Sequence, residues 1–341
     1  MSTWELLHVR ASGILLAMAA RKRNSVARAQ SSESQMTYSR FLELFPDNDA
    51  CLEYLRGKFF PDGSDCPSCG KATKFFRIKS RAAYSCMYCR HQVYPTAGTI
   101  FHKSTVSLQL WFFAIYLMSS TRCGISAKQL EREIGVTYKT AHRMFKQIRT
   151  LLSDDGQLSG DVEADETAVG GKPRAGTIKR LAEQEGRDLS SAGGSWRQRK
   201  KSTVFGMVER GGRVRAQVVA DRSAKTLQGQ IAQHVLPGSM IFTDEWPSYL
   251  GIDKTHGHRR VKHSAHVYVD GDLHTQTIEG FWSLFKNGVR GVYHAVSTTY
   301  LQDYLNEYTF RYNRRDGREP MFWAILARVE QRRLVARPTG S

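Results

Sequence analysis

Four of the six cysteines come in two closely spaced pairs, and this spacing constrains the chain more than any other feature of its sequence. Two residues separate Cys66 from Cys69 and Cys86 from Cys89, and sixteen residues lie between the pairs. A C-x2-C pair on a tight turn directs two sulfurs at one point, so two such turns can close a tetrahedron of thiolates around zinc. The sequence therefore predicts one structural Zn²⁺ in a zinc ribbon.

Two disulfide bonds in a secreted domain are the alternative for these cysteines. A signal peptide does not support it, because the apolar run over residues 14–20 is short and basic residues follow it. Cys51 and Cys123 would also be left without partners. Zinc is therefore favoured. We expect a zinc-ribbon domain over residues 36–100, after a disordered extension over residues 1–35.

The chain is strongly basic, since 50 Lys and Arg against 32 Asp and Glu give a net charge of +18. Such an excess indicates a polyanionic partner, with nucleic acid first and an anionic membrane second. A membrane span needs about 20 apolar residues, and the longest apolar run, residues 110–118, has nine. The content of 41% hydrophobic and 24% charged residues excludes a mostly disordered or collagen-like chain. We expect a chain that binds nucleic acid and no membrane.

A helical domain is expected over residues 101–155, and it contains the pattern of a helix-turn-helix. Ser126 can cap a first helix that ends at Gly135, and Thr137 can cap a second helix. In this fold the N-terminal half of the second helix enters the major groove of DNA. An ordinary helical hairpin in a core is the alternative. The side chains expected to contact DNA are Lys139, His142 and Arg143.

Four acidic residues gather within six positions of a predicted strand, residues 161–166. Alternate side chains of a strand share a face, so Asp161, Glu163 and Asp165 would lie on one side of the sheet. Carboxylates stacked in this way repel one another unless a cation lies between them. An acidic edge in contact with solvent is the alternative.

Two further acids lie on elements that are predicted later in the chain. Asp244 ends a short apolar strand, and Glu279 lies on a predicted helix with Lys286 on the same face two turns later. The order strand, hairpin, helix, strand, helix predicts a multidomain α/β protein in which residues 156–325 form an RNase H-like mixed sheet flanked by helices. Two Mg²⁺ (or Mn²⁺) ions suit such a site, because they prefer hard oxygen ligands and can stabilise both oxygens of a phosphoryl displacement.

The amino-acid sequence around these acids resembles that of the DDE transposases of insertion sequences, in particular the ISXO-like group with an N-terminal zinc ribbon. The resemblance covers about residues 36–325. It rests on the segments EADET (163–167), GGK (170–172), FTD (242–244), HSA (263–265), HTQTIEGFWS (274–283) and FRYNRR (310–315). It implies that Asp165, Asp244 and Glu279 are the metal-binding catalytic acids, and that the ribbon and the helix-turn-helix bind transposon ends.

The resemblance implies a DNA transposase that performs metal-dependent strand cleavage and strand transfer. Its partners would be double-stranded DNA, as terminal inverted repeats and as target, and it would act as a homo-oligomer on DNA. Such a protein would be cytoplasmic and nucleoid-associated, of bacterial type. Lys286 and Arg290 are expected to contact phosphate. One alternative is a non-catalytic zinc-ribbon and helix-turn-helix regulator with a degenerate nuclease-like domain, and another is a nuclease without strand transfer.

Neighbouring side chains are rivals for the metal site. Spacing alone does not separate the catalytic acids from Glu163, Glu166 and Glu245. In part of the group an Asn three positions before the Glu takes the third role, and here that position is Gln276.

The sequence also predicts a role for a glycine-rich basic segment, for two histidines and for the last residues of the chain. Residues 170–201 contain nine Lys and Arg and six Gly, and they are interpreted either as a basic insertion that orders on DNA or as a plain surface loop. His263 and His274 are expected to line or cap the site. Residues 326–341 are expected to form a C-terminal tail.

Overall fold

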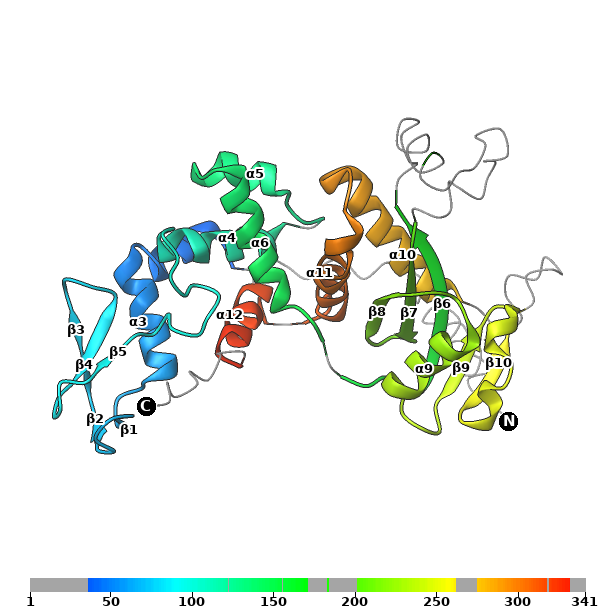
Figure 1. Cartoon of the computed structure of the whole chain (residues 1–341), viewed down its shortest axis with the longest axis horizontal. Helices are drawn as coiled ribbons and strands as arrows, with labels where there is room; N and C mark the ends of the chain where they lie inside the picture. Colours follow the sequence, from blue (N-terminus) through cyan, green and yellow to red (C-terminus); the bar gives the residue numbers. More distant parts are fainter. Residues whose placement is uncertain are drawn as a thin grey trace, which may run out of the picture.

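A computed structural model describes residues 36–121, 123–154, 156–170, 183, 201–261, 275–317 and 319–331. The predicted extension over residues 1–35, most of the basic insertion, and His263 and His274 lie outside the described residues. The molecule is elongated, with a small β unit at one end, helices in the middle and a larger sheet at the other end (Figure 1). No helix in the described part of the chain is both long and apolar enough to cross a membrane.

The small β unit is the zinc ribbon, and it packs against the helix α3 (Asn48–Phe59). Its antiparallel strands are β1 (Ser64–Asp65), β2 (Ala72–Thr73), β3 (Phe75–Ile78), β4 (Ala83–Cys86) and β5 (Gln92–Val93). The Tyr84 hydroxyl donates to a Glu53 carboxylate oxygen at 2.7 Å, and the Arg77 guanidinium donates to Asp49 at 2.8 Å. These polar contacts fix the ribbon to the helical part of the chain.

The helical middle is organised around one strongly apolar helix, α4. Its helices, besides α3, are α2 (Tyr38–Leu44), α4 (Leu108–Ser120), α5 (Ala127–Ile134), α6 (Tyr138–Thr150) and α12 (Met321–Gln331). Trp111, Phe112 and Ile115 of α4 are buried, because a helix that is apolar nearly all round lies in a core. Phe322 and Ile325 of α12 join the same core. The boundary expected after residue 325 therefore falls inside a helix, and residues 326–331 are not tail.

The α5–α6 turn forms where the local sequence predicts it. The Ser126 hydroxyl accepts the Gln129 N–H at 3.1 Å and caps α5. Gly135 ends α5 in the left-handed conformation, with φ of 68°, which glycine adopts without strain. The Thr137 hydroxyl then accepts the Thr140 N–H at 3.4 Å and caps α6. The two helices are thus joined by a sharp, capped turn.

The larger sheet has the strand order β10-β9-β6-β7-β8. Its strands are β6 (Asp161–Val169), β7 (Ser202–Glu209), β8 (Val214–Val219), β9 (Met240–Thr243) and β10 (Gly257–Arg260). The first three form an antiparallel meander, whereas β9 and β10 run parallel to β6. The chain is therefore a mixed α/β protein with a zinc ribbon, which confirms that part of the predicted fold.

Helices cover both faces of this sheet (Figure 1). The helices are α9 (Ala224–His234), α10 (Gln276–Gly288) and α11 (Leu301–Asn313), with short 3₁₀ segments at Pro247–Tyr249, Ile252–Lys254 and Thr298–Tyr300 and a π-helical segment at Val289–Tyr293. Val162 and Ala164 of β6 face α9, while Val204 and Val208 of β7 pack with α10 and α11. The alternation predicted for β6 is present, so Glu163 and Asp165 lie on the α10 side.

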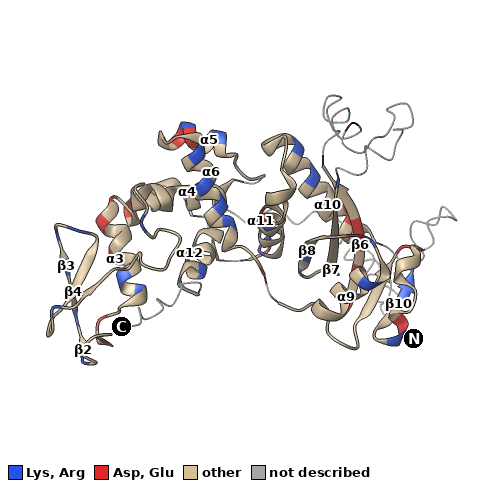
Figure 2. Ribbon diagram, viewed as in Figure 1, with Lys and Arg blue, Asp and Glu red and all other residues tan. Residues whose placement is uncertain are grey.

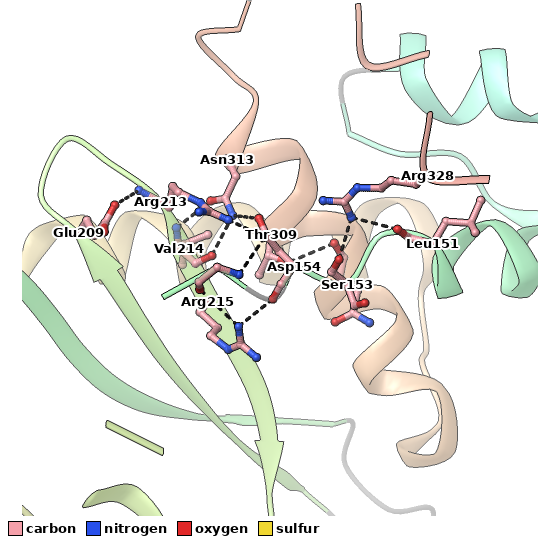
Figure 3. A network of polar contacts seen from close by, with 12 residues as sticks. Leu151, Ser153, Asp154, Glu209, Arg213, Val214, Arg215, Thr309, Asn313 and Arg328 are labelled. Carbon is pink, nitrogen blue, oxygen red and sulfur yellow. Dashed lines mark hydrogen bonds and ion pairs between the residues drawn. The ribbon is translucent and has the colours of Figure 1, made fainter. Parts of the chain in front are cut away.

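The segment between the helical middle and the sheet is held by polar side chains from both (Figure 3). Arg328 of α12 donates to the carbonyl oxygens of Leu151 at 2.9 Å and Ser153 at 2.8 Å. On the sheet side, Arg215 donates to the Asp154 carbonyl at 2.7 Å, and Asn313 of α11 donates to the Asp154 carboxylate at 3.2 Å. The segment over residues 151–154 is therefore fixed by side chains from several elements.

Candidate functional site

The four paired cysteines converge on one point. The Sγ atoms of Cys66 and Cys89 lie 3.6 Å apart, those of Cys69 and Cys86 lie 3.9 Å apart, and all four fall within 4.8 Å of one another. Zn–S bonds of about 2.3 Å in a tetrahedron place the sulfurs about 3.8 Å apart. All six cysteines are free thiols, so the disulfide alternative is wrong. The predicted zinc site is confirmed.

Two similar turns position these sulfurs. The Gly70 N–H donates to the Cys66 carbonyl at 2.9 Å, and the Arg90 N–H donates to the Cys86 carbonyl at 3.2 Å. Both donors have left-handed backbones, with φ of 68° for Gly70 and 63° for Arg90. Gly70 meets this requirement without strain, as its place after the second cysteine predicts, whereas Arg90 adopts it at some cost.

Asp165 and Asp244 lie side by side at the sheet. In the parallel pairing of β6 and β9, Glu163 lies opposite Phe242. Asp165 follows two residues later within β6, and Asp244 comes directly after the last residue of β9. Burial raises the pKa of Asp165 to about 7, and the negative charges of Glu166 and Asp244 act in the same direction. The two aspartates are therefore close enough for their charges to interact.

Glu279 lies on the first turn of α10, which crosses the same face of the sheet as Asp165. Its side chain is exposed, and the Thr275 hydroxyl donates to its Oε1 at 3.3 Å. Among the residues that the structure describes, the four cysteines form the one group of three or more metal-ligand atoms within 4.8 Å. Asp165, Asp244 and Glu279 are thus neighbours in the fold without forming so tight a group.

The donors at Asp165 fit a hard divalent cation. Neighbouring carboxylates destabilise the charge of Asp165, and a cation beside it would reverse that effect. Lys286, on the same helix as Glu279, is also close to Asp165. Burial lowers the pKa of the Lys286 ammonium, and the negative charge of Asp165 partly offsets this. The site therefore combines oxygen ligands with a lysine that can meet a phosphate.

Glu163, a rival ligand by spacing, has another role. Its fully buried carboxylate accepts the backbone N–H groups of Thr277 at 2.8 Å and Ile278 at 3.1 Å. It also accepts the Thr277 hydroxyl at 2.9 Å and the Arg210 Nε–H at 3.0 Å. Glu163 thus satisfies the free N–H groups at the start of α10 and ties this helix to β6.

The other rivals have different surroundings. Glu166 projects to the α9 side of the sheet and accepts a hydrogen bond from the Tyr249 hydroxyl. Burial raises the pKa of Glu166, this hydrogen bond lowers it, and the charge of Asp244 raises it again. Glu245 and Gln276 are exposed, and Gln276 is the first residue of α10.

The side chains expected to contact DNA lie along α6 and at the end of α10, where Figure 2 shows Lys and Arg on both helices. Lys139 and Arg143 of α6 are exposed, as is Arg290 after α10. His142 is half-buried, with its ring centroid 5.2 Å from that of Tyr300. His142 therefore contacts the segment that leads into α11 as well as solvent.

Two contacts near the acids were not predicted from the sequence. One is the Glu163 cap of α10, and the other is a hydrogen bond of 2.9 Å from the Trp282 indole to Asp165. Both join residues more than a hundred positions apart, so local spacing cannot find them. One signal was present, because Gly206 lies inside a strand otherwise rich in apolar residues, which indicates close approach of another group.

Comparison with known proteins adds independent information. Residues 157–313 match the ISXO2-like transposase domain, and residues 46–92 match a transposase zinc-ribbon domain. A protein from Halobacterium salinarum, described as an uncharacterized protein in transposable element ISH50, is 30% identical over 271 residues, which cover 76% of this chain and 90% of the relative. The two matched ranges include the paired cysteines and the acids Asp165, Asp244 and Glu279.

Proposed function

Because the chain belongs to the ISXO2-like transposases with a zinc ribbon, we propose that it cuts the ends of an insertion sequence and joins them to target DNA. The observation that carries this proposal is the closeness of two aspartates on adjacent parallel strands. Asp165 lies in the middle of β6, Asp244 directly follows β9, and the charge of Asp244 acts on Asp165. Glu279 and Lys286 lie on the helix that packs over the same strand.

The fold supports this proposal at two places. A meander of three antiparallel strands, with two further strands parallel to its first strand, supports the assignment of this sheet as RNase H-like. The capped helices α5 and α6, joined at Gly135, have the form of a helix-turn-helix. We assign the first to strand cleavage and the second to DNA recognition.

In this proposal Asp165, Asp244 and Glu279 hold the metal ions. When bound, two Mg²⁺ ions would supply activation of the attacking oxygen and neutralisation of charge on the scissile phosphate. The ammonium of Lys286 would contact a phosphate oxygen beside Asp165 and orient the strand. The half-buried position of Asp165 excludes part of the solvent and strengthens these electrostatic contacts.

DNA binding would involve both halves of the chain. Lys139 and Arg143 of α6 are free to enter a major groove, while Arg290 extends the basic surface beyond Lys286. The net charge of +18 suits a long phosphate contact. The DNA would be the terminal inverted repeats and the target, bound by a homo-oligomer.

The test is Mg²⁺-dependent nicking and joining of DNA that carries the terminal repeats. We expect Asp165→Asn and Asp244→Asn to lower cleavage by at least about a thousandfold while binding of the ends survives. Asp161→Asn is the matched control, because Asp161 is an exposed acid on the same strand and should cut normally.

The same assay separates the alternatives. DNA binding without any cleavage by the wild-type protein would favour a regulator, and cleavage without a joined product would favour a nuclease. Normal cleavage by either asparagine variant would remove that residue from the site.

A further inference from the structure

The carboxylate of Asp165 is held by a tryptophan from the neighbouring helix. The Nε1–H of Trp282 donates to Oδ2 of Asp165 at 2.9 Å, and only 4% of the Trp282 surface is exposed. Burial, which raises the pKa of Asp165, is opposed by this hydrogen bond. The indole has no free electron pair for a metal, so its contact with the carboxylate can only orient or stabilise it.

A glycine makes room for the indole. Gly206 of β7 is the direct partner of Asp165 on β6. A Cβ atom at position 206 would lie 2.5 Å from Cζ2 and 2.6 Å from Cη2 of Trp282, closer than van der Waals contact allows. The sheet therefore has no side chain at position 206, where the indole ring approaches it. Any larger residue at 206 would force the indole away from Asp165.

The position of Trp282 on α10 links it to the other groups of the site. Trp282 is three residues after Glu279 and four before Lys286, about one helical turn from each. Glu163 fixes the start of the same helix through the N–H groups of Thr277 and Ile278. Two side chains of one face of β6 therefore hold α10 in register with the sheet.

We propose that Trp282 is a positioning residue, which fixes the rotamer of the Asp165 carboxylate so that its remaining lone pairs point at the metal site. This inference rests on the function proposed above. A metal ligand that is held by a hydrogen bond from a neighbour loses less freedom on binding. Removal of such a neighbour typically weakens metal binding about 10–100-fold.

Trp282→Phe is the first test, because it keeps an aromatic ring in the core and removes the N–H donor. The readout is Mn²⁺ binding to the zinc-loaded protein without DNA, measured by electron paramagnetic resonance. The Mg²⁺ concentration that gives half-maximal cleavage provides a second measurement. We expect the dissociation constant for Mn²⁺ and the half-maximal Mg²⁺ concentration both to rise about 10–100-fold in the variant. Cleavage at saturating Mg²⁺ should fall much less.

The matched control is Trp111→Phe. Trp111 is 1% exposed and donates its Nε1–H to the Ser104 hydroxyl at 2.8 Å, but it lies in the helical core. This variant removes an equivalent buried hydrogen bond, so its effect on thermal stability should be similar. Its Mn²⁺ affinity should equal that of the wild type.

A second replacement guards against misfolding of Trp282→Phe. A benzothiophene analogue of tryptophan at position 282 keeps the shape of the indole and lacks only the N–H, and it should show the same loss of Mn²⁺ affinity. Wild-type affinity in this protein, or in a folded Trp282→Phe, would overturn the inference and assign Trp282 to packing alone. If the wild-type protein itself neither binds Mn²⁺ nor cuts DNA, the proposed function fails instead.

Discussion

Glu163 and Asp165 lie two residues apart on one face of β6, and their surroundings differ. Glu163 accepts hydrogen bonds from the start of α10 and from Arg210, so its charge is compensated within the protein. Asp165 accepts one from Trp282 and has negative neighbours at Glu166 and Asp244. A carboxylate with uncompensated charge is the one that a bound cation would stabilise most. The contrast supports a structural role for Glu163 and the proposed role of Asp165 as a metal ligand, a distinction that spacing alone does not make.

Glu163→Gln should therefore lower stability and leave the metal site in place. The amide keeps the shape of the side chain but loses its charge and one acceptor, at a cost of about 2 kcal/mol in the free energy of unfolding. Urea unfolding measures this, with Asp161→Asn on the same strand as a control expected to change it by less than about 0.5 kcal/mol. A folded Glu163→Gln protein with unchanged stability and no Mn²⁺ binding would show that Glu163 is a ligand.

Among the elements, α11 joins the helical middle to the sheet. Glu307 of α11 is fully buried and accepts from Arg149 of α6 at 2.7 Å and from Arg311 at 2.9 Å. The Arg149 guanidinium also lies 4.0 Å from the centroid of the Tyr304 ring. The helix that we assign to DNA recognition is thus tied to a helix that covers the larger sheet. We infer that α6 and the sheet keep a fixed relative orientation.

This junction predicts sensitivity to acid. Burial would raise the pKa of Glu307, but the charges of Arg149 and Arg311 outweigh it and hold the pKa below its ordinary value of 4.5. A lowered folded-state pKa contributes stability that is present above about pH 4.5 and is lost as the pH falls through the folded pKa. Glu307→Gln should cost about 3–5 kcal/mol at pH 7, since two buried guanidinium groups lose their partner.

Urea unfolding between pH 7 and pH 3 measures this. The difference between wild type and Glu307→Gln should begin to shrink below about pH 4.5, where the unfolded wild-type chain takes up a proton at this carboxyl group. It should continue to shrink until the pH falls through the lower folded-state pKa, where the native carboxylate also becomes neutral. Arg40→Gln, which removes an exposed ion pair with Glu43, serves as the control and should have little effect at any pH. A difference that stays constant down to pH 3 would place the acid sensitivity elsewhere.

Local sequence predicts the elements of this chain better than their packing. Ser126 and Gly135 mark the ends of α5 because caps depend on neighbouring residues alone. The return of α12 to the core around α4 involves residues about two hundred positions apart, so the pattern near residue 325 could not set that boundary. The same holds at the site. The strand and helix patterns predict which elements carry Asp165 and Glu279, and only the family resemblance implies their role, but neither predicts the contact of Trp282 with Asp165.

For the whole molecule, the distance between the zinc ribbon and the sheet predicts that zinc and the catalytic site are independent (Figure 1). The ribbon core is small, and it includes Phe75, Tyr84, Val93 and two of the zinc-binding cysteines. So small a core rarely folds without its metal. Removal of zinc should unfold the ribbon and leave the helical core and the sheet intact.

Cys86→Ser, or a chelator that releases one equivalent of zinc, tests this prediction. DNA binding should weaken, and the slope of log K against log salt should fall by about one for each phosphate that the unfolded ribbon no longer neutralises. The main thermal transition and Mn²⁺ binding should persist, because the sheet that positions Asp165 and Asp244 has hydrophobic cores separate from that of the ribbon. Added Zn²⁺ should restore DNA binding to the chelated wild type but not to Cys86→Ser. Loss of Mn²⁺ binding together with zinc would mean that the ribbon supports the sheet, contrary to the two separate cores of the fold.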